Sequence, residues 1–290
     1  MSIAMDAACL QCSLRRNLET AQSLGTAEET MEFARELLQL YLDAPRDVPS
    51  TWITPQVTQL LHRRYGLDID RFRQEKLDSN RLVLTHMPRI QERVCSAADP
   101  VLAGLQFAIL GNYLDFSALQ GQISFETFSD MLDSAEKMAF DMEAFRALCR
   151  DLEAGKRLLY LTDNAGEIGF DRIFAEEIAR CYPQLEITFC VRGGPTLNDA
   201  TREDAETVGI PFRVIDNGNL VPGTQLNLLS REAKDALESA DVILAKGMAN
   251  VETLYGCGYN IYYAFLVKCQ RFVNLFHQPM MTPMLVREIR

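Results

Sequence analysis

The hydrophobic period of the chain changes near Gly155, and this change limits the folds that the chain can adopt. Between about residues 26 and 150, apolar side chains recur at the three- and four-residue spacing of amphipathic helices. After Gly155, short apolar runs of strand length alternate with segments of helical spacing. That alternation is typical of a mostly parallel sheet with helices on both faces. We therefore predict an α/β, Rossmann-like fold preceded by an all-helical N-terminal part.

The same change divides the chain into two expected parts. Residues 1–150 would form a helical subdomain that covers a site, and residues 151–290 a Rossmann-like domain that binds metal and phosphate. In the first part, Thr26 and Glu29 form a capping box, while Pro55 and Gly66 mark the start and end of another helix. Further helices are expected near residues 82–94 and 101–114. No low-complexity linker separates the parts, so we expect them to pack as one body.

The predicted strands place three polar loops at one edge of the sheet. Strands are expected at residues 157–162, 187–191, 212–215, 241–245 and, as the last, 272–276. In an open parallel sheet, ligands bind beyond the carboxyl ends of the strands. The loops after the first, second and fourth of these strands are therefore the candidate site.

The first loop carries Asp163 and Asn164 directly after a buried strand. A carboxylate and an amide oxygen at this position can coordinate one hard cation. Ala165 and Gly166 would leave their backbone amides open to an anion at the start of the next helix. The alternative is an ordinary turn in which Asp163 caps the helix.

The other two loops add a carboxylate and a cation. Asp199 follows a neighbouring strand, although alone it would be read, together with Asn198, as a helix cap. Lys246 directly follows an apolar strand and is itself followed by Gly247, so its ammonium group needs a partner, which a phosphate could supply. The alternative is a surface lysine in a turn.

A family resemblance rests on short strings in these loops. D-N-A-G-E at 163–167, R-G-G-P-T-L-N-D-A-T at 192–201 and K-G-M-A-N-V-E-T-L at 246–254 resemble the metal-dependent damage-control phosphatases, formerly domain of unknown function 89. The family also carries an acidic-residue methyltransferase-like label. V-P-G-T at 221–224 and K-C at 268–269 agree with it. C-L-Q-C at 9–12 and G-N-Y-L-D at 111–115 are similar to the CxxC and GNxID marks of its prokaryotic-type branch.

The resemblance implies roles for particular residues. Metal ligands would be Asp163, Asn164 and Asp199, and the catalytic residues Asp163 and Glu167. Substrate and phosphate contacts would come from Gly166, Asn198, Lys246, Gly247, Asn250, Glu252, Asn112 and Asp115. Gly169 replaces a bulkier apolar residue of the family pattern, which we expect to reshape the substrate pocket. A second metal or a structural role is considered for Cys9, Cys12 and Cys269, beside the alternative of an idle cysteine pair.

The ligand types indicate which metals suit the site. The proposed ligands are oxygen donors, and none of His62, His86 and His277 lies in the three loops. Magnesium or manganese is the physical default for such ligands, and the resemblance widens the choice to cobalt or nickel. The nucleophile is a metal-activated water or Asp163 itself, and Glu167 is the expected residue for proton transfer.

Composition restricts the partners. A net charge of −11 disfavours nucleic acid and anionic membranes, and the chain has neither a signal-peptide pattern nor an apolar run of membrane-spanning length. We expect a cytoplasmic hydrolase acting on a sugar phosphate or a damaged phosphorylated metabolite. The alternatives are a non-catalytic metal-dependent sugar-phosphate-binding protein and a carboxyl methyltransferase. The single glycine in D-N-A-G-E disfavours methyltransferase and nicotinamide-cofactor sites.

Overall fold

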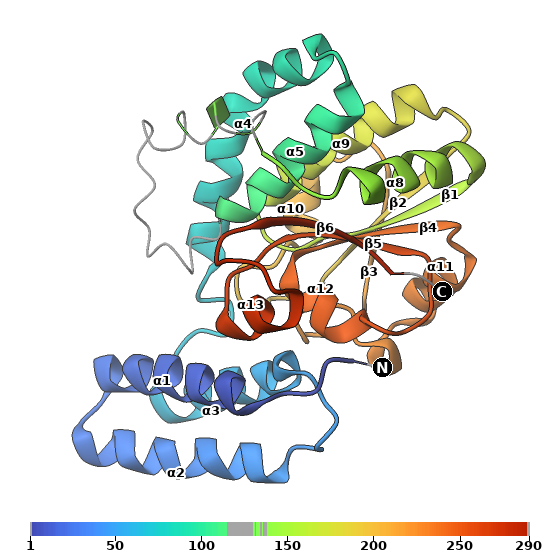
Figure 1. Ribbon diagram of the computed structural model, residues 1–290. Coiled ribbons are helices and arrows are strands. Elements are labelled where there is room, and N and C mark those ends of the chain that lie inside the picture. Colours follow the sequence, from blue (N-terminus) through green and yellow to red (C-terminus); the bar gives the residue numbers. More distant parts are fainter. Residues whose placement is uncertain (1, 115–129, 131, 134, 136–137, 289–290) are drawn as a thin grey trace.

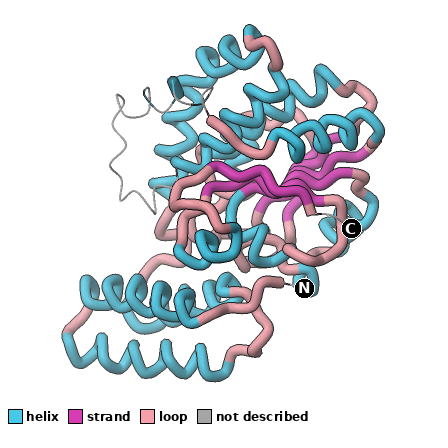
Figure 2. Tube along the Cα trace, in the orientation of Figure 1, coloured by secondary structure: helices cyan, strands magenta, loops and turns pink. Residues whose placement is uncertain are grey.

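A six-stranded sheet forms the centre of the molecule (Figures 1 and 2). The computed structural model describes residues 2–114, 130, 132, 133, 135 and 138–288. The strand order is β3-β2-β1-β4-β5-β6, and all neighbouring strands are parallel except β5 and β6. The strands are β1 (Arg157–Leu161), β2 (Glu186–Val191), β3 (Arg213–Asp216), β4 (Val242–Lys246), β5 (Ile261–Leu266) and β6 (Pro283–Arg287). The predicted Rossmann-like α/β fold is confirmed.

Helices cover both faces of this sheet. On one face lie α5 (Pro100–Gly111), α8 (Met142–Ala154) and α9 (Glu167–Cys181), with α4 (Arg73–Ser96) packed behind α5 and α9 (Figure 1). On the other face lie α11 (Arg231–Ser239), α12 (Gly247–Leu254) and α13 (Gln270–Phe276). Alternate strand residues supply the two cores: Leu158 and Tyr160 face α5 and α9, while Leu159 and Leu161 face the opposite layer. The short α10 (Arg202–Thr207) follows the loop after β2.

The first three helices form a group of their own beside this sandwich. They are α1 (Ala7–Leu24), α2 (Ala27–Asp43) and α3 (Thr54–Tyr65), with the 3-10 turn η1 (Ser50–Ile53) before α3. Their apolar faces enclose a separate core that includes Phe33, Leu37 and Leu60. The expected capping box at Thr26 is present, and Gly66 ends α3 with a left-handed backbone. The helices of the N-terminal region therefore lie in two places. The helices α1, α2 and α3 form the separate group, whereas α4, α5 and α8 pack in the layers that cover the sheet.

The end of the sheet differs from the sequence prediction. Residues 272–276, expected as the last strand, belong to helix α13, and the strands β5 and β6 were missed. Aromatic and branched residues suit both kinds of element, but Phe272 and Phe276 are four residues apart and both contact the Phe265 ring. That spacing places them on one face of a helix. Packing of these two rings against β5 therefore favours a helix, although the composition of the segment suits a strand.

Gly169 has a packing role that the sequence did not indicate. A Cβ at this position would lie 2.7 Å from Cγ1 of Val83 on α4. The missing side chain allows α4 and α9 to approach closely, and the expected effect of Gly169 on a substrate pocket stays a prediction. In the part of the chain that the structure describes, no helix has the length and apolar character needed to cross a membrane.

Candidate active site at the carboxyl end of the sheet

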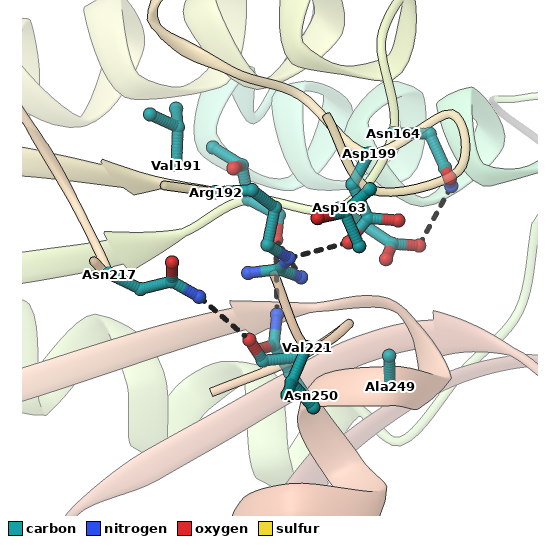
Figure 3. A network of polar contacts seen from close by, with 12 residues as sticks. Asp163, Asn164, Val191, Arg192, Asp199, Asn217, Val221, Ala249 and Asn250 are labelled. Carbon is teal, nitrogen blue, oxygen red and sulfur yellow. Dashed lines mark hydrogen bonds and ion pairs between the residues drawn. The ribbon is translucent and has the colours of Figure 1, made fainter. Parts of the chain in front are cut away.

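The loops after β1 and β2 are joined by a short backbone bridge. Asn164 pairs with Asp199 in this bridge, the Ala165 amide donates to the Asn198 carbonyl at 2.9 Å, and the Ala200 amide donates to the Asp163 carbonyl at 2.7 Å. The bridge brings the side chains of Asp163, Asn164 and Asp199 into one buried place beyond the sheet (Figure 3). The structure thus assembles the three predicted metal ligands, which are two carboxylates and one amide.

Electrostatics at Asp163 indicate a need for positive charge. Burial raises the pKa of Asp163 well above its ordinary value, and the nearby carboxylates of Glu167 and Asp199 raise it further. Lys268 and Arg192 oppose this shift. Carboxylates crowded away from water repel one another, and a divalent cation relieves that repulsion. The site therefore fits a hard cation both in its donor atoms and in its charge.

Two asparagine amides fix the relative position of Asp163 and Glu167. Nδ2 of Asn112, at the end of α5, donates to Asp163 Oδ2 at 2.9 Å and to Glu167 Oε2 at 2.8 Å. Nδ2 of Asn164 donates to the same two oxygens at 2.8 and 3.0 Å. Nδ2 of Asn164 is used by the two carboxylates, so the amide oxygen is the atom of this side chain that could serve as a metal ligand. Asn112 thereby lies beside Asp163 and Glu167, and its expected contact with a substrate stays a prediction.

Behind this layer lies a fully buried charge cluster, defined here as Lys246, Glu167 and Asp171. The ammonium group of Lys246 donates to Ala108 O at 2.8 Å, Glu167 Oε1 at 2.7 Å and Asp171 Oδ1 at 2.6 Å. Asp171 Oδ1 also accepts from the Tyr160 hydroxyl at 2.8 Å. All three hydrogens of the Lys246 ammonium are thus used inside the protein. In this structure the partners of Lys246 are carboxylates, whereas the sequence suggested a phosphate.

The charge cluster alters the proton affinity of its members. Burial raises the pKa of Asp171 to about 7, although the charge of Lys246 opposes that shift. Burial disfavours the charge on Lys246, but the two carboxylates outweigh this effect and its pKa is raised. Oδ2 of Asp171 is buried and has no hydrogen-bond partner among the described residues.

The expectation of open backbone amides at the start of α9 is wrong. The Gly166 amide donates to Asn80 Oδ1 on α4 at 2.7 Å, and the Ala165 amide is used in the bridge to Asn198. Asn80 in turn donates to Asp204 at 2.8 Å, so this contact ties α4 and α10 to the loop. An anion would have to find its donors elsewhere.

Gly247 meets a steric requirement at the start of α12. Its φ is +75°, and a Cβ there would collide with the carboxylate of Asp163. The backbone after β4 therefore passes directly against the proposed metal ligand. A glycine is needed for both reasons, since other residues rarely adopt this conformation and none would fit.

Asn250 and Glu252, expected to contact substrate, have structural partners. Asn250 donates to the carbonyls of Thr162 at 3.1 Å and Lys246 at 2.7 Å, and accepts from Thr224 at 2.7 Å. Glu252 accepts from the Ser50 hydroxyl at 2.6 Å, and burial raises its pKa. These contacts connect α12 to the sheet and to the first three helices.

The remaining predicted residues lie away from Asp163 or outside the described part. Asp115 lies outside the described residues. Cys9 and Cys12 are on α1 and Cys269 precedes α13, where Nη1 of Arg271 contacts Cys9 Sγ at 3.1 Å. Among the described residues, no three His, Cys, Asp or Glu side chains are grouped as metal ligands. The structure therefore adds no support for a metal bound by the cysteines, and the Asp163 centre depends on an amide ligand.

Three residues around the candidate site received no role from the sequence. Lys268 follows β5 and lies close enough to Asp163 to lower its pKa, but β5 itself was not predicted. Arg192 begins the string at residues 192–201 that contributed to the family resemblance, but it was given no role. Asp171 lies four residues after Glu167, and that helical spacing was a usable signal that both carboxylates share a face.

Comparison with known proteins identifies relatives of this chain. Residues 5–282 match the family model of the damage-control phosphatase ARMT1-like domain. An uncharacterized protein of Methanocaldococcus jannaschii is 32% identical over 93% of this chain and 90% of its own length. A damage-control phosphatase of Archaeoglobus fulgidus is 34% identical over 70% of this chain and 71% of its own.

A solved structure supports the same conclusion. The crystal structure of the DUF89 family protein PH1575 of Pyrococcus horikoshii covers 98% of this chain and 99% of its own, with a TM-score of 0.83 and 25% identity. The same protein appears among the curated relatives as a damage-control phosphatase, 37% identical over 52% of each chain. The family model, spanning nearly the whole chain, decides the matter: the chain belongs to the damage-control phosphatase ARMT1-like family.

Proposed function

We propose that this member of the family is a metal-dependent phosphomonoester hydrolase acting on a small phosphorylated metabolite, such as a sugar phosphate or a damaged phospho-metabolite. The observation that carries the proposal is the buried group of Asp163, Asn164 and Asp199, in which burial and the neighbouring carboxylates raise the pKa of Asp163. These residues would hold Mn²⁺, Co²⁺, Ni²⁺ or Mg²⁺. Such an ion, when bound, polarises a phosphoryl oxygen and activates water.

The protein residues around the site supply the rest of the chemistry. Lys268 follows the carboxyl end of β5 and its charge acts on Asp163, and we assign it to a phosphoryl oxygen. This assignment replaces Lys246, whose three donors are directed to internal acceptors. Local positive charge from Lys268 and from a bound divalent ion would allow an anion to bind a chain whose net charge is −11.

The contacts of Asp163 and Glu167 favour water as the nucleophile. Asp163 Oδ2 accepts hydrogen bonds from two amides, which holds the carboxylate in place as a ligand. Glu167 is fully buried and both of its oxygens accept hydrogen bonds. We assign Glu167 to orienting Asn112 and Asn164. In the reaction the water oxygen would bond to phosphorus and the ester P–O bond would break, and the proton that the water gives up would end on the leaving oxygen.

A phosphate-release screen tests the proposal. Metal-stripped protein would be supplied with each of the four ions and with a panel of phosphorylated metabolites plus an aryl phosphate. We expect metal-dependent release that Asp163→Ala lowers by at least about 100-fold, the scale of losing one transition-state contact. Asp235→Ala, at an exposed site on α11, is the matched control and should retain full activity.

Two results would contradict the proposal in different ways. Tight metal-dependent binding of a sugar phosphate without any turnover would identify a binding protein. Phosphate release that is unchanged in Asp163→Ala would leave the activity standing but place it at another site. Glu167→Gln separates the roles of Glu167, since a proton-transfer role predicts a loss as large as that of Asp163→Ala, and an orienting role a smaller one.

A further inference from the structure

We propose that Arg192 is a positioning residue. It holds the loops after β1 and β2, which carry the proposed metal ligands, in place relative to each other, and it determines which oxygen of Asp199 faces the cation. This inference rests on the proposed metal site and deepens it. The residue is the first after β2, and its side chain extends beneath Asp163 and Asp199 toward Asn250 (Figure 3). Only 1% of Arg192 is exposed, so its charge is held entirely by protein groups.

The guanidinium group connects the ends of two neighbouring strands. Nε donates to Asp199 Oδ2 at 2.5 Å, in the loop after β2, and Nη2 donates to the Thr162 carbonyl at 3.2 Å, at the end of β1. Thr162 directly precedes Asp163. The Arg192 backbone amide also donates to the Ala200 carbonyl at 2.9 Å, which closes the loop that carries Asp199. One side chain therefore contacts both loops that supply the ligands.

This contact determines how Asp199 can bind a cation. Because Oδ2 is directed to Arg192, the carboxylate presents Oδ1 to the metal and binds through one oxygen. The planar guanidinium is needed for this arrangement, since two donors in a rigid fork reach a carboxylate and a carbonyl at once, and an ammonium point charge does not reproduce that geometry. Groups that orient metal ligands in this way commonly change metal affinity about 10- to 100-fold.

A contribution to folding stability does not by itself explain why an arginine is buried at position 192. Its third nitrogen, Nη1, is buried without a hydrogen-bond partner among the described residues. An unpaired buried donor is costly, and a buried ion pair is often no more stabilising than apolar side chains of similar size. An arrangement that persists despite this cost is expected where the geometry serves a site.

The chain offers a matched control in Arg202. Its Nε donates to the Asp216 carboxylate at 2.7 Å and its Nη1 to the Val214 carbonyl at 2.8 Å. Arg202 thus has the same two kinds of acceptor as Arg192, but its side chain is 47% exposed and its carboxylate is not a proposed ligand. Arg192→Lys and Arg202→Lys therefore make the same chemical change in two settings.

The experiment measures Mn²⁺ affinity by calorimetry, independently of turnover. We expect Arg192→Lys to bind Mn²⁺ about 10- to 100-fold more weakly than the unaltered chain, and Arg202→Lys to bind it equally well. The visible spectrum of bound Co²⁺ should change in Arg192→Lys alone. If Arg192→Lys binds Mn²⁺ as tightly as the unaltered chain while Asp199→Ala loses it, the inference is wrong and the metal site stands. If the unaltered chain binds no metal, both fail.

A second measurement does not depend on the variant folding. In a crystal structure of the unaltered chain with Mn²⁺, Asp199 should contact the ion through Oδ1 alone while Oδ2 stays on Arg192. Coordination through both oxygens, or release of Arg192 from Asp199, would overturn the inference.

Discussion

Two ionic clusters in this protein join neighbouring elements with similar chemistry but in opposite surroundings. On the surface, Arg63 and Arg64 of α3 pair with Glu32 and Glu36 of α2, and the Arg64 side chain is 33% exposed. Beneath the active site, the charge cluster of Lys246, Glu167 and Asp171 is 0% exposed. Water screens the first cluster, whereas the second depends on its own internal balance.

The difference teaches where the chain tolerates the loss of a charge. On the surface, a charge that loses its partner is solvated by water. In the buried cluster, two carboxylates share one ammonium, and removing that ammonium leaves negative charge with no solvent to stabilise it. The buried cluster also supports Glu167, which accepts from the amides of Asn112 and Asn164. Disturbing it should therefore affect both folding and the site.

The largest effect is expected for Lys246→Met. Methionine is unbranched like lysine but has no charge, so the substitution leaves Glu167 and Asp171 without their cation. We expect the free energy of unfolding at pH 7 to fall by about 3–5 kcal/mol, the scale for breaking a buried pair. Urea denaturation followed by circular dichroism would measure the change. Lys234→Met, on the exposed face of α11, makes the same substitution at the surface, and equal losses in the two variants would refute the comparison.

An intermediate effect is expected on the pH dependence of stability. The pKa of Asp171 is raised by burial to about 7, so the folded state holds this proton more tightly than the unfolded state does. Its contribution to stability is present below the ordinary carboxyl pKa and is lost as pH rises toward 7. A separation of about three pH units corresponds to at most about 4 kcal/mol.

Asp171→Asn removes this dependence. Between pH 5 and 7.5, the free energy of unfolding of the unaltered chain should fall more steeply with pH than that of the variant. Denaturation curves at several pH values would give both slopes. Parallel slopes would show that Asp171 is already ionised at the lower pH and that Lys246 outweighs burial.

The smallest effect is expected for Arg64→Met. The variant loses the ion pairs to Glu32 and Glu36, yet all groups involved remain accessible to water. Its melting temperature should stay close to that of the unaltered chain, and raising the salt concentration should reduce the remaining difference. A loss comparable with that of Lys246→Met would mean that the α2–α3 interface depends on charge more than on its apolar core.

Much of the site could be predicted because its ligands follow local rules. Asp163, Asn164 and Asp199 each follow a strand that the hydrophobic pattern identified, and the carboxyl ends of parallel strands meet at one edge. Gly247 and Asn112 also lie against Asp163 in the structure, while their expected contacts with substrate stay predictions. The resemblance to damage-control phosphatases came from the same loops, and the family assignment is confirmed.

The misassigned details depend on partners far away in the sequence. Lys246 and Ala108 are separated by 138 residues, and Gly166 and Asn80 by 86 residues. The neighbouring sequence does not indicate whether the Lys246 ammonium group faces a phosphate or internal carboxylates. It also does not indicate whether the Gly166 amide has a partner within the protein. β5 was missed, and with it the position of Lys268, because the apolar residues at 272–276 were taken as the strand that follows residues 241–245.

The sequence by itself determined the alternation of strands and helices, and hence the edge of the sheet where the ligands gather. It could do so because hydrophobic period and strand-end position are properties of neighbouring residues. Only the tertiary structure decided which charges neutralise one another: Lys246 with Glu167 and Asp171, and Arg192 with Asp199. Those pairings arise when separate elements exclude water from the same volume, so every buried charge must find its partner there.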